Sequence, residues 1–206
     1  MPYRPTEKTE ARKKAQYNLL LMTALTLVAR EGFQNLTIAL LAEQAQVAIG
    51  TVYKYFESKA DLCAAVFRRA TEKELAKVQL AAFPEGLDIS CEQRLSNAIK
   101  VFSERALKGY RLAYALIAEP VDAIVQHERL KYRQAYGAIF EALIAEAISS
   151  KEFCQQDVQV TAAALVGTLA ETVLGSIGSH ISEAKEIDQQ NLIKNIQGFC
   201  LRAVKS

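Results

Sequence analysis

Apolar residues recur at helical spacing along most of the chain, and a few glycines and prolines interrupt the pattern. One apolar stripe predicts a helix over residues 8–31 that ends at Gly32, with a buried face of Ala15, Leu19, Met22, Leu25 and Ala29. Two short helices are expected between Thr37 and Phe56. A fourth helix is expected from a Ser58 cap to about Ala82, followed by the chain break Phe83-Pro84-Glu85-Gly86.

Five further helices are expected beyond residue 86. The first carries an apolar stripe of Leu95, Ile99, Phe102 and Ala106. Gly109 and Pro120 bound a short second one, because the residue before a proline disfavours helix. Longer helices follow over residues 123–149, 157–179 and 187–204. The pattern therefore predicts an all-α protein of about nine helices.

Composition agrees with that fold class and limits the chemistry. Of 206 residues, half are hydrophobic and only four are proline, so a sizeable helical core can form. Four cysteines stand far apart without a CxxC pair, and neither histidine has a partner at metal-ligand spacing, so we expect reduced thiols, no metal site and no cofactor. The start of the chain lacks the apolar region of a signal peptide, which favours a cytoplasmic protein.

Residues 158–181 are the one stretch that resembles a membrane span. They include Gln159, Glu171 and His180, so a buried helix explains them better, and we expect no membrane association.

The two short helices have the character of a DNA-reading pair. Thr37 can cap the first through its hydroxyl, and Leu40 and Leu41 would be buried. The second begins near Ile49 and runs to Phe56, with Val52 and Phe56 on its inner face. Its outer face carries hydroxyls, one cation and no carboxylate, which suits a DNA groove.

The segment LTIALLAEQAQVAIGTVYKYFESKADL resembles the helix-turn-helix of the tetracycline-repressor (TetR) family, and the resemblance spans roughly residues 13–69. It rests on a G-T-V-Y-x-Y-F recognition helix followed by S-K-x-x-L. The resemblance implies phosphate contacts from Thr37, Tyr53, Tyr55 and Lys59, and places Gly50, Thr51 and Lys54 near base edges. Gln46 and Ala48 depart from the family's usual turn glycine and hydroxyl cap, so the sequence leaves the turn geometry there open.

The balance of charged residues differs between the part of the chain that holds the helix-turn-helix and the remainder. Residues 1–69 hold ten Lys and Arg against six Asp and Glu, whereas residues 70–206 hold fifteen against seventeen. We expect a disordered tail over residues 1–7, a basic DNA-binding domain over residues 8–69 with its motif at 37–56, and a helical ligand-binding and dimerisation domain over residues 70–206.

Two sites are expected in the second domain. An aromatic cluster of Phe102, Tyr110, Tyr114, Tyr132 and Tyr136 predicts a pocket for a small apolar or aromatic effector, the alternative being ordinary core. The helix over 157–179 is dense in small residues. In TetR-like proteins the last two helices pair with a second subunit, which implies a homodimer interface of Ala163, Gly167, Ala170, Leu192, Ile196 and Phe199, the alternative being an internal helix pair.

These features favour one of three function classes. We expect a ligand-responsive regulator, most often a repressor in this family, that binds a palindromic double-stranded DNA operator as a dimer. An enzyme is not expected, because no nucleophile motif or phosphate loop is present. A helical ligand-binding or adaptor protein without DNA binding is the alternative, and Gln46 and Ala48 are the only features that favour it.

Overall fold

The computed structural model describes residues 7–183 and 188–205, and within these ranges the regular structure is entirely helical. The DNA-reading end comprises α1 (Glu7–Glu31), α2 (Ile38–Gln44), α3 (Ile49–Tyr53) and the first turns of α4 (Lys59–Ala82). The rest comprises α5 (Cys91–Lys108), α6 (Tyr110–Ile117), α7 (Ala123–Ser149), α8 (Val158–Glu183) and α9 (Gln189–Lys205). The expected all-α fold and helix order are confirmed.

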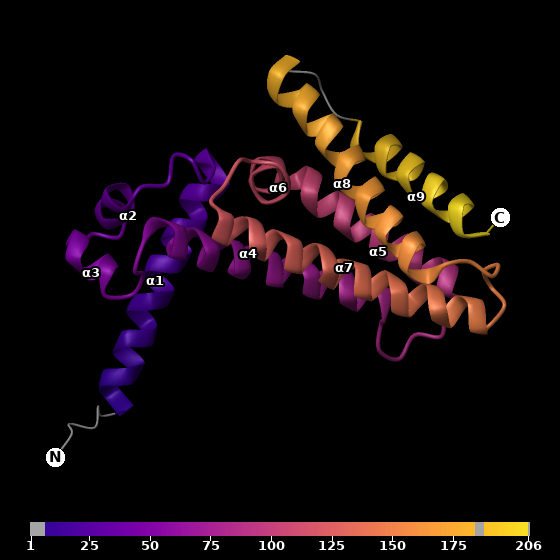
Figure 1. The fold of residues 1–206 in the computed structure, drawn as a ribbon, viewed down its shortest axis with the longest axis horizontal. Helices are drawn as coiled ribbons and strands as arrows, with labels where there is room; N and C mark the ends of the chain where they lie inside the picture. The colour runs from indigo at the N-terminus through magenta and orange to yellow at the C-terminus, as the bar shows by residue number, and fades with distance from the viewer. Residues whose placement is uncertain (1–6, 184–187, 206) are drawn as a thin grey trace.

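Helix α4 connects the two ends of the molecule. Its N-cap Ser58 accepts a hydrogen bond from the Asp61 amide, and it runs unbroken from the helix-turn-helix beside the long helix α7 (Figure 1). Two buried clusters divide along it. One gathers α1, α2, α3 and α4 up to Ala70, and the other begins at Val78 and gathers the α5, α7, α8 and α9 core.

The first buried cluster also receives residues from the second part of the chain. Ala115 and Leu116 of α6 and Val125 of α7 pack into it. Helix α6 therefore lies where the two clusters meet, in contact with α1 on one side and with α5 and α8 on the other (Figure 1).

The buried face of α1 differs from the expected one. Leu20, Leu21, Ala24, Leu27 and Val28 are buried, whereas Leu19 and Met22 are about half exposed. The apolar run from Leu19 to Met22 is continuous, so spacing alone does not select a face. The neighbours decide, because α4 and α6 pack on the side that carries Leu20 and Leu27.

Two boundaries also differ from expectation. Helix α3 ends at Tyr53 and not at Phe56, although Phe56 is still buried through a tight turn in which its amide bonds the Val52 carbonyl at 3.1 Å. Helix α1 begins at Glu7, one residue earlier than expected, and the remainder of the expected tail lies outside the described residues, as does the expected start of the last helix at Ile187.

Candidate DNA-binding surface and ligand cavity

The turn between α2 and α3 closes around Gln46. Its φ of 54° is left-handed, its amide bonds the Glu43 carbonyl at 3.0 Å, and the Val47 amide bonds the Ala42 carbonyl at 2.9 Å. This is the Schellman arrangement, whose left-handed position usually holds glycine. Ala48 caps α3 without a side-chain hydrogen bond. The turn therefore keeps its closing hydrogen bonds despite both departures, which removes the support for a protein without DNA binding.

Aromatic packing from α1 fixes the end of the recognition helix. The ring of Tyr17 stacks on Phe56 with centroids 5.3 Å apart and meets Tyr55 at 6.4 Å. Val52 and Phe56 anchor the inner side, so the outer side of α3 is held toward solvent. Tyr17 was missed in the sequence, where only its position within a helical run marks it.

The seven residues expected at DNA lie on one end of the molecule, but their surroundings differ. Tyr53 is 53% exposed, Lys54 is exposed, and a Cβ at Gly50 would meet open space, while Thr51 is half-buried. Tyr55 is half-buried against Tyr17. The Thr37 hydroxyl accepts from the Leu40 amide at 3.1 Å, and Lys59 donates from Nζ to the Gln34 carbonyl at 3.1 Å.

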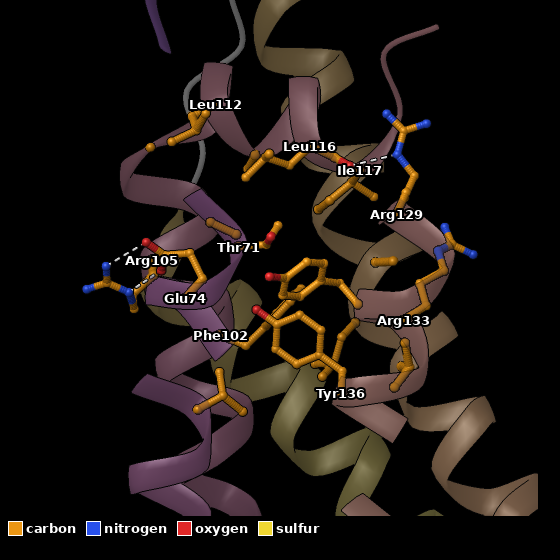
Figure 2. Close-up of a pocket in the computed structure, with 18 of the residues that line it drawn as sticks. Thr71, Glu74, Phe102, Arg105, Leu112, Leu116, Ile117, Arg129, Arg133 and Tyr136 are labelled. Carbon is orange, nitrogen blue, oxygen red and sulfur yellow. Dashed lines mark hydrogen bonds and ion pairs between the residues drawn. The ribbon is translucent and has the colours of Figure 1, made fainter. Parts of the chain in front are cut away.

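A cavity of about 600 Å³ lies in the second part of the chain, enclosed by α4, α5, α6, α7 and α8. Its walls are mainly apolar, with Phe102, Phe140, Leu116 and Leu169 among them (Figure 2). Charged side chains stand at its edges. Glu74 and Arg105 form an ion pair there that includes a 2.7 Å bond from Nη2 to Oε1, and Lys108 and Arg133 also border the space.

Three of the five aromatic residues expected at a pocket line this cavity, namely Phe102, Tyr132 and Tyr136. Tyr110 and Tyr114 do not, so that part of the expected set is corrected. The buried face of α6 carries Ala113, Ala115 and Leu116, which leaves Tyr114 40% exposed and turns Tyr110 to an edge contact with His180 at 4.9 Å. Leu112, Ala113, Leu116 and Ile117 line the cavity instead.

Arg129 connects the cavity wall to the end of α6. This side chain is almost fully buried and donates from Nε to the Leu116 carbonyl at 2.8 Å and from Nη2 to the carbonyls of Ala115 and Glu119 at 3.2 and 2.9 Å. Burial, and then the like charge of Arg133, lowers the pKa of Arg129. An arginine remains protonated there, so it acts as a cationic clamp on the last turn of α6.

Glu119 extends that connection to the DNA-binding end. Its carboxylate is 7% exposed and accepts from the amides of Phe33 and Gln34 at 2.8 and 2.9 Å, in the loop that leads into α2. The same loop offers the Gln34 carbonyl to Lys59. A carboxylate directly after a helix C-terminus is repelled by the negative end of the helix dipole. This unfavourable placement is the one sequence feature that indicates a partner for Glu119 elsewhere in the fold.

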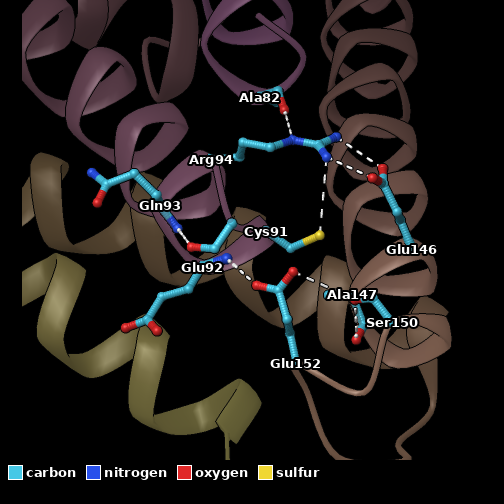
Figure 3. Close-up of polar contacts among 10 residues, drawn as sticks. Ala82, Cys91, Glu92, Gln93, Arg94, Glu146, Ala147, Ser150 and Glu152 are labelled. Carbon is cyan, nitrogen blue, oxygen red and sulfur yellow. Dashed lines mark hydrogen bonds and ion pairs between the residues drawn. The ribbon is translucent and has the colours of Figure 1, made fainter. Parts of the chain in front are cut away.

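The far end of the second domain is held by a separate polar cluster. Arg94 bonds the Ala82 carbonyl at 2.7 Å and both oxygens of Glu146 at 2.6 and 2.9 Å, while Glu152 accepts from the Glu92 amide at 3.3 Å (Figure 3). The Arg94 bond lowers the pKa of Glu146. These contacts tie α5 to α4 and α7, so this end of the domain is a fixed frame around the cavity.

The expected dimer interface divides between two sides of its helices. Ala170 lines the cavity and Ile196 is buried in the core, so these two are corrected, whereas Leu192 is only half-buried against the core and stays a prediction. Ala163 is exposed, a Cβ at Gly167 would meet nothing within 4 Å, and Phe199 is 54% exposed.

By length and composition Val158–Ile181 could cross a membrane, but such evidence is weak, and 33% of its most apolar window is buried.

A helix-turn-helix on a helical domain that encloses an apolar cavity defines a DNA-binding, ligand-responsive regulator. Residues 20–66 match the profile described as "Bacterial regulatory proteins, tetR family". A fatty acid metabolism regulator of Bacillus subtilis is 23% identical over 169 residues, covering 78% of this chain and 83% of that protein. The transcriptional repressor KstR of Mycolicibacterium smegmatis is 26% identical over 151 residues, 70% and 68% of the two chains.

Solved structures show the same fold. The regulator FadR from Bacillus subtilis in complex with stearoyl-CoA superposes with a TM-score of 0.76 at 19% identity, over 91% of this chain and 99% of that one. The fatty acid degradation regulator FadR from Bacillus halodurans gives 0.74 at 21% identity, over 90% and 94%. Residues 20–66 thus carry a DNA-binding domain of the TetR family, and the proteins that the whole chain resembles are transcriptional regulators and not enzymes.

Proposed function

We propose that this regulator represses transcription by binding a palindromic operator as a two-fold dimer, and that a ligand with a long apolar part releases it from DNA. Such a role places its action at the chromosome, in the cytoplasm. The observation that carries the proposal is the run of hydrogen bonds from the cavity wall, through Arg129 and Glu119, to the loop that opens the helix-turn-helix.

The DNA contacts follow from exposure and charge. Tyr53 and Lys54 stand out from α3, and the open space at Gly50 lets the backbone approach a groove. Lys54, Gly50 and Thr51 would face base edges, while Tyr53, Tyr55, Lys59 and Thr37 would contact phosphates. Lys59 would exchange its bond to the Gln34 carbonyl for a phosphate, or use a second of its three donors.

The proposed dimer interface is the outer face of α8 and α9. Val160 is 66% exposed, and a Cβ built at Gly167 or Gly175 would meet no atom of another described element within 4 Å. Small residues in a row let a second backbone approach closely, and Phe199 at 54% exposure adds a large apolar contact. The revised set keeps Ala163, Gly167, Leu192 and Phe199 and adds Val160.

The proposed ligand is an amphipathic molecule such as a long-chain acyl-CoA. The apolar walls suit an acyl chain, and Lys108 and Arg133 at the edges suit an anionic head. The related fatty acid metabolism regulator and the FadR structure in complex with stearoyl-CoA support this class. Filling the cavity would shift the last turn of α6, and with it Glu119 and the loop before α2. A ligand that prefers the shifted arrangement would then weaken operator binding.

The test is fluorescence anisotropy with duplex DNA from upstream of the protein's own gene. Operator affinity is measured alone, with stearoyl-CoA and with coenzyme A lacking the acyl chain. A coupling of roughly 1–3 kcal/mol predicts that stearoyl-CoA weakens binding by about 5- to 150-fold while coenzyme A has no effect. Binding that does not distinguish this DNA from a shuffled duplex would contradict the operator proposal, and an unaltered affinity with stearoyl-CoA would contradict the acyl ligand.

A further inference from the structure

The apolar cavity contains one hydroxyl that the protein itself does not use. The Tyr136 side chain projects from α7 into the space between α4 and α7, and its oxygen points inward (Figure 2). The ring is held in place by Phe102, which meets it edge-on with centroids 5.6 Å apart and an interplanar angle of 90°. The position of the hydroxyl is therefore set by packing, independently of any hydrogen bond.

Within residues 7–183 and 188–205, no protein group accepts from or donates to the Tyr136 hydroxyl. Burial, and then the neighbouring Glu74 carboxylate, raises the pKa of this phenol, so it keeps its proton at physiological pH. Tyr136 is half-buried and lines the cavity, so its hydroxyl can be satisfied by water or by a ligand there. An apolar ligand that displaces the water would leave this donor without a partner, which costs free energy.

Two further oxygens line the same cavity, one on α4 and one on α7. The Thr71 hydroxyl donates to the Phe67 carbonyl at 2.6 Å, which leaves its lone pairs available as acceptors. The Tyr132 hydroxyl reaches the Arg68 carbonyl only at 3.4 Å. The cavity therefore combines the Tyr136 donor with nearby acceptors, which matches a small uncharged oxygen group. A carboxylate fits less well beside Tyr136, because the nearby Arg105 is already paired with Glu74.

We propose that the ligand carries a neutral oxygen, as a hydroxyl or carbonyl inside an otherwise apolar skeleton, and that Tyr136 donates a hydrogen bond to it. This inference rests on the proposed acyl ligand and narrows it: the preferred effector is an oxygenated chain and not a plain hydrocarbon one. A saturated chain fills the same volume but leaves the Tyr136 donor unsatisfied. The hydroxyl thus selects between ligands of nearly equal shape.

The experiment compares stearoyl-CoA with hydroxystearoyl-CoA and oxostearoyl-CoA probes whose oxygen is moved along the chain from carbon 3 to carbon 15. Binding is measured by titration calorimetry with the full-length protein and with Tyr136→Phe, which keeps the ring and removes only the donor. A hydrogen bond of ordinary strength predicts that the best oxygenated probe binds about fivefold more tightly than stearoyl-CoA. In Tyr136→Phe this ratio should fall to about one.

The ratio separates recognition from a general loss of stability, because a damaged fold would weaken both probes equally. Tyr114→Phe is the matched control, since Tyr114 lies outside the cavity lining and its hydroxyl should leave the ratio unchanged. Equal binding of all probes by the wild type, or the same ratio in Tyr136→Phe, overturns this proposal while leaving the acyl ligand intact. Failure of every probe, stearoyl-CoA included, to bind overturns the acyl ligand and this proposal with it.

Discussion

Single residues decide how the recognition helix meets DNA. Lys59 occupies the first turn of α4, beside the recognition helix. Its ammonium group donates a hydrogen bond to the Gln34 carbonyl and has no carboxylate partner among the described residues. A cation in that state is available to a phosphate at little cost, whereas an ion-paired one would first have to exchange partners. Its contribution should therefore be independent of DNA sequence.

Lys59→Ala is expected to weaken binding to operator and to unrelated duplexes alike, and to reduce the slope of log K against log salt by about one. The measurement is anisotropy at several salt concentrations. Lys77→Ala is the control, because Lys77 is exposed on α4 within the second domain and should leave the slope unchanged. A slope that is the same in Lys59→Ala as in the wild type would remove this residue from the phosphate contacts.

Gln46 shows a local conflict between residue type and backbone. A left-handed φ of 54° costs an L-residue free energy that glycine avoids. Gln46→Gly should raise the free energy of unfolding by about 0.5–1 kcal/mol, measured by urea denaturation. Glu43→Gly, three residues earlier and within α2, should lower it by a similar amount because glycine is unfavourable inside a helix. Destabilisation by both would contradict the left-handed turn.

At the scale of elements, α6 is the piece that both buried clusters share. Its last turn is clamped by Arg129 from the cavity side, and the following residue pair Ala118-Glu119 leads to the two amides of the α1–α2 loop. Arg111 adds a 3.0 Å bond from α6 to the Arg30 carbonyl at the end of α1. A shift of α6 thus acts directly on the base of the helix-turn-helix, rather than only by pressing on α4.

Glu119→Ala should separate ligand binding from DNA release. Stearoyl-CoA should bind the variant with nearly wild-type affinity, since Glu119 is not part of the cavity lining, but its effect on operator affinity should fall to less than half. Stability should drop by about 1–3 kcal/mol, because the amides of Phe33 and Gln34 lose their acceptor.

Calorimetry and anisotropy on the same protein give the two quantities. Glu85→Ala removes an exposed carboxylate in the α4–α5 turn and should change neither. Full DNA release in Glu119→Ala would show that the signal travels by another route, through α4 for example.

At the scale of the whole molecule, the outer face of α8 and α9 determines whether two recognition helices act together. Gly167→Leu places a large side chain where a Cβ meets open space, so the isolated chain should tolerate it, and helix propensity even favours it. The variant should be monomeric by light scattering and should lose most operator affinity. Ala138→Leu, on the exposed side of α7, should remain dimeric. A dimeric Gly167→Leu would place the interface elsewhere.

The sequence by itself determined the helices and the DNA-reading motif. Ser58, Gly109 and Pro120 act through local backbone chemistry, so α4, α5 and α6 begin and end where their own residues dictate. The Thr37 cap and the buried Val52 could be placed for the same reason, whereas Phe56 was predicted to be buried within the helix and is buried through the turn that follows it.

Tertiary structure decided everything that depends on a partner distant in sequence. The continuous apolar run in α1 offers several faces, and α4 and α6 select the one with Leu20 and Leu27. Neighbouring helices also decided that Tyr114 faces solvent and that Ala170 faces the cavity. Both residues lie on helices that are apolar on most sides, so the sequence pattern does not indicate which side packs against another helix. Glu119 lies 86 residues from Phe33, and periodicity carries no information about a hydrogen bond across that separation.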